Sequence, residues 1–258
     1  YKALQGVRGR KSVDLGALER LLVQFSRLVA EQPLIKEMDI NPLLASPDGL
    51  VAVDARVVLH DPQADPTSLP RPAIRPYPVQ YVKTVALKDG TKVTFRPIRP
   101  EDETLMHAFH QSLSERSVYM RYFEPLHFSE RVAHERLIRI CFIDYAREMA
   151  LVADYQDASG KHEILGVGRL SPGRDPLERE FSLLVSDQWQ NRGLGSALLS
   201  ELAGIGRSEG LAAIQGHILP ENQPMRRLCE RLGFEIRLSG DSRNLEARLT
   251  LAGAPGKK

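Results

Sequence analysis

The sequence has very few cysteines, no long apolar run and almost no net charge. Its only cysteines are Cys141 and Cys229, which excludes a disulfide framework and leaves no second pair for a zinc site. No stretch approaches the roughly 18 to 20 continuous apolar residues of a membrane span. The formal net charge of +2 gives no strong field toward phosphates. These shortages predict a cytoplasmic protein with neither a membrane nor a nucleic-acid partner.

Proline, by contrast, is concentrated in one stretch that divides the chain. Between residues 61 and 78 apolar periodicity is lost and six prolines occur: Pro62, Pro66, Pro70, Pro72, Pro76 and Pro78. Because proline fixes its own backbone and restrains the residue before it, residues 61–80 are predicted to form a stiff, extended linker. The linker separates a region over residues 1–60 from a domain over residues 81–252. Residues 253–258 are expected to be a disordered tail.

The region before the linker has too few elements for a complete domain. Leucine, phenylalanine and valine at helical spacing predict one helix, which Asp14 caps. Two strand-like runs, residues 34–42 and 50–58, flank the turn signal Ser46-Pro47-Asp48-Gly49 and predict a hairpin. About sixty residues with this content bury little apolar surface. We therefore expect residues 1–60 to be part of a larger domain.

After the linker the pattern changes to an α/β (α+β) succession. A strand is predicted over residues 92–98, followed by helices around residues 103–113 and 130–140 and by strands over residues 149–154, 164–170 and 180–185. The last of these strands leads into Gln190-Asn191-Arg192-Gly193-Leu194-Gly195 and then an amphipathic helix. Backbone N–H groups at a helix start lack intrahelical partners and can hold a diphosphate, which Gly193 and Gly195 leave room to approach. An isolated G-x-G is usually a tight turn alone, but this context favours phosphate binding.

The spacing Q-x-x-G-x-G between a strand and a helix resembles the acetyl-CoA signature of the GNAT superfamily. Asn222, Leu228 and Leu232-Gly233-Phe234 resemble its final helix and closing Gly-Phe. The resemblance implies a GNAT fold, with a central mixed, mostly antiparallel sheet flanked by helices, after a small α/β remnant. It also implies acetyl-CoA as cosubstrate, no metal in this domain, and ligand contacts from Leu184, Val185, Gln190, Asn191, Arg192, Gly193, Leu194, Gly195, Ser196 and Asn222.

Several of these roles stay open at the level of sequence. Asn222 either contacts the ligand or orders the junction between strand and helix. A charge-assisted bond to the 3′-phosphate of CoA is expected from Arg192, Arg226 or Arg227. The thioester carbonyl is expected to be polarised by the backbone N–H of Leu184 or Val185.

Acyl transfer to an amine also needs a base, because a lysine amine is nearly all ammonium at neutral pH. Glu180 occupies the position of the catalytic glutamate in bacterial protein lysine acetyltransferases, which the chain resembles, and Glu178 is the competing candidate. Many GNAT enzymes have a tyrosine seven residues after the Asn222 position that protonates the leaving thiolate. This chain has Cys229 there, a residue expected to be buried in a helix. The thiolate is then expected to leave unassisted or to take a proton from water.

Two further segments narrow the resemblance. Residues 113–123 and 143–150 resemble the acetyltransferase domain of Pat-type lysine acetyltransferases, which implies a protein substrate, possibly an acyl-CoA synthetase. In the same region five arginines alternate with glutamates: Arg116, Arg121, Arg131, Arg136 and Arg139 with Glu115, Glu124, Glu130 and Glu135. This alternation predicts a helix surface laced with salt bridges rather than a nucleic-acid patch.

The first sixty residues carry a second resemblance. Residues 37–42 and 53–56 resemble the end of the ATP-grasp domain of NDP-forming acyl-CoA synthetases, in which the positions of Asn41 and Asp54 hold the magnesium of the nucleotide. The part of that domain that holds adenine and triphosphate would precede Tyr1. We therefore expect these positions to be non-functional here and the chain to be the C-terminal piece of a parent with further synthetase-like domains.

These observations lead to one hypothesis and two alternatives. The hypothesis is transfer of an acetyl group from acetyl-CoA to a lysine Nε-amine of a target protein, by direct attack with Glu180 as general base. The first alternative is a noncatalytic acyl-CoA sensor. The second, an ATP-grasp acyl-CoA synthetase subunit, is disfavoured by the missing nucleotide-binding half.

Overall fold

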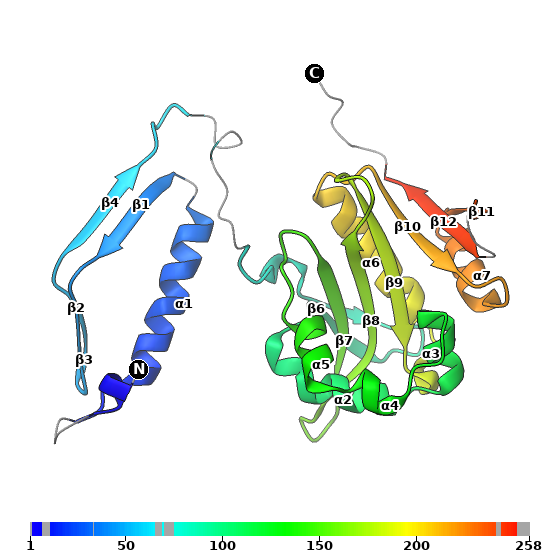
Figure 1. Ribbon diagram of the computed structural model, residues 1–258, viewed down its shortest axis with the longest axis horizontal. Helices are drawn as coiled ribbons and strands as arrows, with labels where there is room; N and C mark the ends of the chain where they lie inside the picture. Colours follow the sequence, from blue (N-terminus) through cyan, green and yellow to red (C-terminus); the bar gives the residue numbers. More distant parts are fainter. Residues whose placement is uncertain are drawn as a thin grey trace. The chain divides into compact units, whose positions relative to one another are not determined.

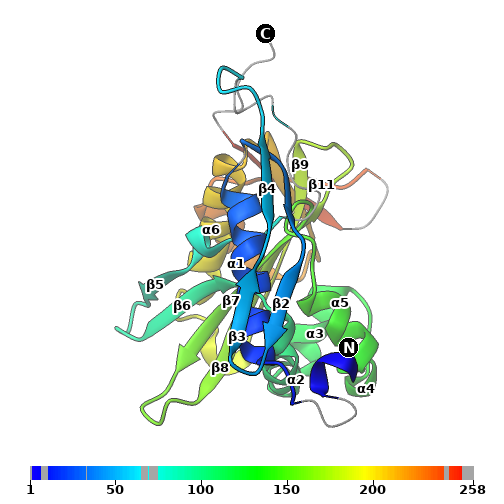
Figure 2. The same cartoon turned by 90° about the vertical axis from the view of Figure 1, so that its left-hand side faces the viewer.

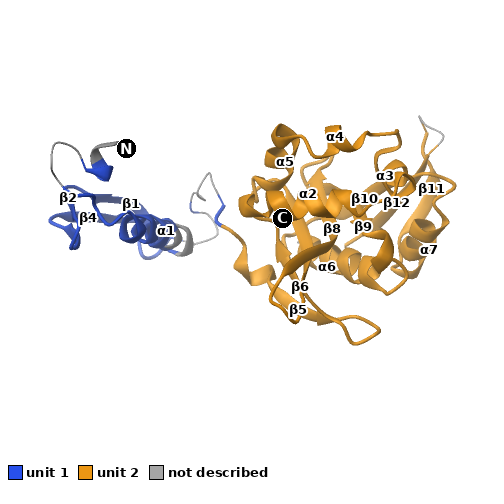
Figure 3. Ribbon diagram, turned by 90° about the horizontal axis from the view of Figure 1, so that it is seen from below, with its two compact units in different colours: residues 1–76 blue, residues 77–258 orange. Residues whose placement is uncertain are grey.

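The computed structural model describes residues 2–6, 11–32, 34–64, 69, 75–240 and 244–251. The chain forms two compact units, Tyr1–Pro76 and Tyr77–Lys258 (Figure 3). Residues 65–68 and 70–74 of the expected linker, and the expected tail over residues 253–258, lie outside the described residues. The unit boundary falls inside the expected linker because Tyr77 already contacts the second unit, where its hydroxyl donates to the Pro97 carbonyl at 2.8 Å.

The first unit contains one long helix and a hairpin divided into two parts. Helix α1 (Leu15–Glu31) follows the short 3₁₀ turn η1 (Lys2–Gln5), and Asp14 caps it by accepting the Ala17 N–H at 2.9 Å. Strand β1 (Ile35–Ile40) pairs antiparallel with β4 (Ala55–Leu59), and β2 (Leu43–Ser46) pairs with β3 (Gly49–Ala52). The predicted hairpin is thus interrupted at Asn41-Pro42 and at Val53-Asp54, where the Asn41 N–H donates to the Asp54 carbonyl at 3.1 Å.

No residue of the first unit whose surroundings are described reaches the buried class. Several large apolar side chains are exposed to solvent instead. They include Leu22, Val23, Val51 and Leu59, each more than half exposed. Burial of apolar surface is the main stabilising contribution to a fold. The first unit therefore lacks a core of its own.

The second unit is built on one eight-stranded sheet with the strand order β11-β12-β10-β9-β8-β7-β6-β5 (Figure 1). All of its neighbouring strands run antiparallel except β9 and β10, which are parallel. The strands are β5 (Lys83–Ala86), β6 (Lys92–Pro97), β7 (Met149–Gln156), β8 (His162–Pro172), β9 (Glu178–Val185), β10 (Ala213–Ile218), β11 (Glu235–Leu238) and β12 (Leu245–Thr250).

Helices cover both faces of this sheet and create two cores. Helix α6 lies on one face, and Figure 2 shows α2 to α5 grouped away from it. The helices are α2 (Glu103–Gln111), α3 (Glu115–Tyr122), α4 (Phe128–Arg131), α5 (His134–Cys141), α6 (Leu194–Ser208) and α7 (Gln223–Arg231), with 3₁₀ turns η2 (Val79–Tyr81), η3 (Pro100–Asp102) and η4 (Asp187–Trp189). Along β9, alternation directs Phe181 and Leu183 to the α6 core and Leu184 to the opposite one.

Two glycines of β8 let α6 pack very closely on the sheet. A Cβ at Gly168 would lie 2.9 Å from Leu202 Cδ1, and one at Gly166 would lie 3.1 Å from Leu198 Cδ1. Both leucines are completely buried. The close approach holds the beginning of α6 beside the end of β9.

Helices α3 to α5 do not form the surface that the sequence predicts. Among the described residues, no ion pair joins any of the five arginines of this region to a glutamate. Arg131 is buried and donates to the His110 carbonyl at 2.9 Å, and Arg121 donates to Ser182 on β9 at 2.7 Å. The prediction of a helix surface with many salt bridges is therefore wrong. Arg121 and Arg131 turn inward, where the sheet and α2 supply neutral acceptors.

We expect Leu198→Ala to destabilise the second unit by about 2 to 5 kcal/mol, because it empties a fully buried position against β8. Leu238→Ala is the matched control, since Leu238 on β11 is 74% exposed and its truncation is expected to cost less than about 0.5 kcal/mol. Urea unfolding followed by circular dichroism measures both. Equal losses would contradict this assignment of the core.

The two units should also differ in cooperativity. A fragment comprising residues 77–258 is expected to unfold in one cooperative thermal transition, and a fragment comprising residues 1–76 in none, because the first unit lacks buried side chains. Scanning calorimetry distinguishes the two behaviours. A sharp heat-absorption peak from residues 1–76 alone would overturn this expectation.

Candidate active site

The site begins where β9 and β10 part. The two strands pair only at their starts, from Ala213 opposite Glu178 to Gln215 opposite Glu180. Beyond this point β9 stays paired with β8 and β10 stays paired with β12, so the strands diverge within the sheet (Figure 1). A cavity of about 1040 Å³ opens on the far part of β9 and is walled by α3, α6 and α7.

The start of α6 presents free backbone donors to this cavity. Gly193 caps the helix with a left-handed backbone, φ 91°, and offers no capping side chain. The first helical bond runs from the Ala197 N–H to the Gly193 carbonyl, so the N–H groups of Leu194, Gly195 and Ser196 precede it. Together with the positive end of the helix dipole, these groups form a site for a diphosphate.

The turn before α6 is tied to α3. The Gln190 side-chain Nε2 donates to Ser117 Oγ at 3.0 Å and to the Val185 carbonyl at 3.2 Å. The Asp187 carboxylate accepts three hydrogen bonds: from the Ser114 N–H at 2.9 Å, from the Ser114 hydroxyl at 2.7 Å and from the Ser117 hydroxyl at 2.8 Å. Burial acts to raise the pKa of Asp187, but these hydrogen bonds hold it below its usual value. Gln190 and Asp187 thus fix one wall of the cavity.

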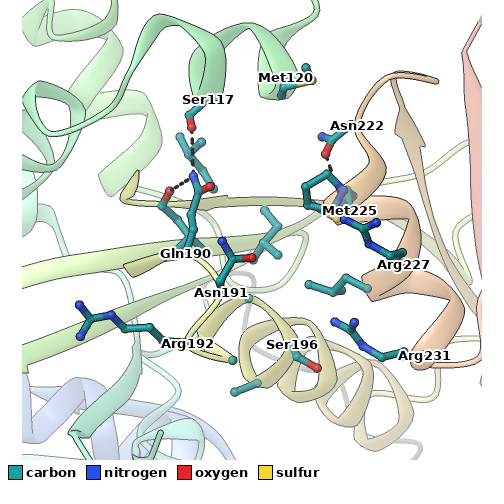
Figure 4. A pocket seen from close by; sticks show the side chains of 18 of the residues that line it. Ser117, Met120, Gln190, Asn191, Arg192, Ser196, Asn222, Met225, Arg227 and Arg231 are labelled. Atoms are coloured by element: carbon teal, nitrogen blue, oxygen red, sulfur yellow. Dashed lines mark hydrogen bonds between the residues drawn. The ribbon is translucent and has the colours of Figure 1, made fainter. Parts of the chain in front are cut away.

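Basic side chains surround the cavity from several elements. Lys88 precedes β6 and its stem passes over Gly193, where an added Cβ would lie 3.3 Å from Lys88 Cε. Figure 4 shows Arg227 and Arg231 reaching from α7 and Arg192 extending from the turn before α6. Arg192 stacks on Trp189, 4.7 Å from the ring centroid, and pairs with Asp89 at 3.3 Å. This arrangement suits a ligand with several phosphate groups.

The structure separates the two adjacent arginines of α7. Arg227 lines the cavity, whereas Arg226 does not and its Nη1 donates to the Pro220 carbonyl at 3.4 Å. Asn222 lines the cavity too, and its side chain caps α7 by accepting the Met225 N–H at 3.2 Å. Of the candidate phosphate ligands, Arg192 and Arg227 are therefore in place and Arg226 is not.

Successive backbone N–H groups of β9 point to opposite edges of the strand, and this alternation decides which of them face the opening. The Ser186 N–H donates to the Leu165 carbonyl of β8 at 2.9 Å. Because neighbouring residues in an antiparallel pair address opposite edges, the N–H of Leu184 also points to β8, while those of Leu183 and Val185 point toward the opening. This alternation favours Val185 over Leu184 as a donor to a ligand in the cavity.

The two candidate bases have different surroundings. Arg248 of β12 binds Glu178 with both ends of its guanidinium, at 2.6 and 3.1 Å, and this hydrogen bonding lowers the pKa of Glu178. Glu180 is exposed, forms no ion pair with any described residue, and marks the last pair between β9 and β10. Glu178 is thus held as a carboxylate, while Glu180 is open to a reacting group.

Cys229 lies in α7 and is completely buried. Burial raises the pKa of its thiol to about 12. A thiol in that state supplies neither a nucleophile nor an accessible acid. The expectation of a buried helix cysteine at this position agrees with the structure.

Most of the residues expected at the ligand share one cavity. Those that line it are Leu184, Val185, Gln190, Asn191, Arg192, Gly193, Gly195, Ser196 and Asn222. Leu194 is the exception, because its side chain is fully buried in the α6 core and only its backbone N–H remains available. Glu180 stands outside the lining, on the exposed part of β9 near the branch point.

Sequence reasoning missed the contribution of α3 and of the turn between β5 and β6. The additional lining residues include Lys88 of this turn and, from α3, Arg116, Ser117, Met120 and Arg121; Arg231 of α7 was also missed. Helix α3 is strongly polar and buries only Val118, so it lacks the apolar periodicity that identifies a helix. Its one usable signal was Ser114, which caps α3 by accepting the Ser117 N–H at 3.2 Å.

The magnesium positions of the ATP-grasp resemblance lie in the first unit. Asn41 and Asp54 are both exposed and meet through the backbone bond across the interrupted hairpin. Within the ranges that the structure describes, no three histidine, cysteine, aspartate or glutamate residues form a group that could hold a metal ion. One carboxylate and one amide are a partial ligand set for Mg²⁺, which also uses substrate phosphates.

Comparison with protein families gives two matches. Residues 1–59 match an ATP-grasp domain, and residues 92–235, more than half of the chain, match an acetyltransferase (GNAT) domain. The beta subunit of an ADP-forming acetate–CoA ligase I from Pyrococcus furiosus is 48% identical over 59 residues, which are 23% of this chain and 25% of that subunit. The chain thus spans about a quarter of that curated relative.

Two further similarities concern the second unit. An acetyltransferase of Pseudomonas aeruginosa is 28% identical over 149 residues, covering 58% of this chain and 78% of that protein. The crystal structure of the GNAT domain of S. lividans PAT superposes with a TM-score of 0.61 at 26% identity, covering 68% of this chain and 99% of that chain. These matches confirm the predicted fold class, the predicted GNAT domain and the predicted ATP-grasp resemblance of the first unit. Across the described residues, no helix has the length and apolar character of a membrane span.

The neighbouring arginines of α7 provide a matched test of the cavity. We expect Arg227→Ala to weaken CoA binding about threefold to tenfold, a modest effect because this side chain is exposed. Arg226→Ala should leave the dissociation constant unchanged. Binding can be followed through Trp189, the single tryptophan, against which Arg192 packs.

A comparison of CoA with dephospho-CoA, which lacks the 3′-phosphate, identifies the phosphate that Arg227 binds. If that phosphate is the 3′ group, dephospho-CoA binds wild type and Arg227→Ala with equal affinity. Equal weakening by the Arg226 and Arg227 substitutions would contradict the assignment of Arg227 to the cavity.

Proposed function

This chain belongs to the GNAT acetyltransferase family, whose acyl donor is acetyl-CoA, and we propose that it acetylates the Nε-amine of a lysine in a target protein with Glu180 as general base. The observation that carries the proposal is the position of Glu180, an exposed carboxylate at the point where β9 leaves β10. The donor cavity follows on the same strand, from Leu183 to Val185. The proposed base and one wall of the donor cavity thus belong to the same strand.

The cavity supports a specific assignment of ligand contacts. The N–H groups at the start of α6, from Leu194 to Ser196, would hold the pyrophosphate of acetyl-CoA. Lys88, Arg192 and Arg227 would neutralise its phosphates. The free edge of β9 would bind the extended pantetheine arm, and the Val185 N–H would polarise the thioester carbonyl.

In the proposed reaction the neutral lysine amine attacks the thioester carbonyl carbon. The new C–N bond forms as the C–S bond breaks, and the electron pair of that bond leaves with the CoA sulfur as a thiolate. The attacking nitrogen loses one proton to water as it becomes the amide nitrogen. Strands rise about 3.3 Å per residue, so Glu180 stands roughly 10 Å from Leu183, where the cavity begins. Glu180 therefore accepts the ammonium proton through water rather than by direct contact. The thiolate takes a proton from solvent, since Cys229 is buried.

The protein acceptor is supported by similarity. Almost the whole length of the solved GNAT domain of S. lividans PAT aligns with this chain, and the first unit matches an ATP-grasp domain. We therefore propose an acyl-CoA synthetase as the target. Acetylation would remove the charge of a lysine in its active site.

We expect Glu180→Gln to lower kcat for acetyl transfer about 10²-fold to 10⁴-fold while the affinity for CoA stays unchanged. Glu178→Gln is the matched control, two residues away on the same strand. It removes the bond to Arg248 and should lower stability without lowering kcat comparably. The assay measures transfer of labelled acetyl from acetyl-CoA to an acetyl-CoA synthetase.

Each outcome has a distinct meaning. Transfer that persists unchanged in Glu180→Gln rules out this residue as the base. Absence of transfer in the wild type together with intact CoA binding favours a noncatalytic acyl-CoA sensor. Formation of a thioester that depends on ATP favours a synthetase subunit.

A further inference from the structure

Three arginines converge on the face of the sheet that carries Glu180. Arg169 on β8 stands directly opposite Ser182 on β9, so both side chains lie on the same face. Arg121 of α3 donates to Ser182 Oγ at 2.7 Å. Arg121 and Arg136 of α5 both pack on the Tyr122 ring, 4.9 and 5.1 Å from its centroid.

These three guanidinium groups are not paired with any carboxylate of the described residues, although the charges of Glu180 and Glu148 act at longer range on Arg121 and Arg169. No described carboxylate forms an ion pair with any of them. Their recorded protein acceptors are neutral: Ser182 for Arg121 and the Ile140 carbonyl for Arg169. The Nε of Arg136 is buried and has no hydrogen-bond partner within the described part of the chain.

The charges also act on one another unfavourably. Burial lowers the pKa of Arg121, and the nearby charge of Arg136 adds to that effect. Burial likewise lowers the pKa of Arg169. The charge of Glu148 acts against this shift, and the charge of Arg121 adds to it. Withdrawing like charges from water without a counter-ion is costly, so a site of this kind is completed by a bound anion.

The location of the cluster indicates which molecule supplies the anion. Glu180 lies two residues from Ser182 on the same face of β9, and its charge acts on Arg121. Arg121 also lines the donor cavity, whereas Arg136 and Arg169 lie outside that lining and remain partly exposed. The cluster therefore extends from the donor cavity toward the side from which the acceptor amine must reach Glu180.

We propose that Arg121, Arg136 and Arg169 bind a carboxylate of the acceptor, close to the amine that is acetylated. The planar fork of a guanidinium matches the two oxygens of a carboxylate. The inference rests on the proposed function, because it takes Glu180 as the base and the acceptor as a lysine compound. Its carboxylate is an acidic side chain next to the target lysine or the α-carboxylate of a free amino acid.

The test uses lysine peptides in which one aspartate is moved through the positions that flank the lysine, each compared with its asparagine counterpart. The wild-type chain should prefer the best aspartate peptide about tenfold in kcat/KM. Arg136→Gln should reduce this ratio to roughly one without changing KM for acetyl-CoA, and Arg136→Lys should retain part of it. Arg139→Gln, an exposed arginine one turn further along α5, is the matched control and should keep the full preference.

Free lysine compared with lysine amide separates the two sources of carboxylate. A preference for aspartate in peptides assigns the site to an acidic side chain of a protein acceptor. A preference for free lysine over its amide, lost in Arg136→Gln, assigns it to the α-carboxylate of a small acceptor. Equal use of aspartate and asparagine peptides, and of lysine and its amide, overturns the inference while leaving protein acetylation intact.

A binding measurement keeps the inference testable if no lysine compound is acetylated. Glutarate, compared with chloride at equal ionic strength, should raise the Tm of the wild type and of Arg139→Gln, and should raise that of Arg136→Gln less. This result without any acetyl transfer would reject the proposed function and support the carboxylate site. An identical response of all three proteins would overturn the site itself.

Discussion

Strand β9 is paired on both edges at its start and on one edge at its end, and the site depends on this change. Through Glu180 its far edge is occupied by β10, and beyond that residue the edge is open. Backbone groups left unpaired in this way need partners. A bound ligand with its own amides can supply them, so the parting of two parallel strands creates both the space and the hydrogen-bonding edge for a long, extended donor.

The surrounding elements keep that opening in shape. Helix α6 is pressed onto β8 through Gly166 and Gly168, which sets its amino end beside the open edge. Gln190 and Asp187 attach α3 to the same turn by hydrogen bonds. The cavity therefore lies between elements held by packing on one side and by a polar network on the other, an arrangement that preorganises a site.

Positive charge is divided between two places with different consequences. Lys88, Arg192 and Arg227 line the cavity, where they suit the phosphates of the donor. Arg121, Arg136 and Arg169 stand on the α3 face of the sheet, the face that also carries Glu180, the proposed base. A net charge of only +2 conceals both groups, because acidic residues elsewhere cancel them in the sum.

The sequence alone determined the features that a few neighbouring residues encode. Gln190 to Gly195 specify a turn and a helix start through glycine geometry, and the leucines of α6 specify its buried face through their spacing. Tertiary structure decided which distant residues meet. Arg248, 70 positions away in the sequence, binds Glu178 and so disfavours Glu178 as the base. Helix α3 lines the cavity although its own sequence lacks a helical apolar pattern. Such contacts follow from strand order and helix packing, which no local spacing expresses. For the same reason the salt bridges predicted from alternating charges do not occur among the described residues, where Arg121 and Arg136 instead cluster with Arg169.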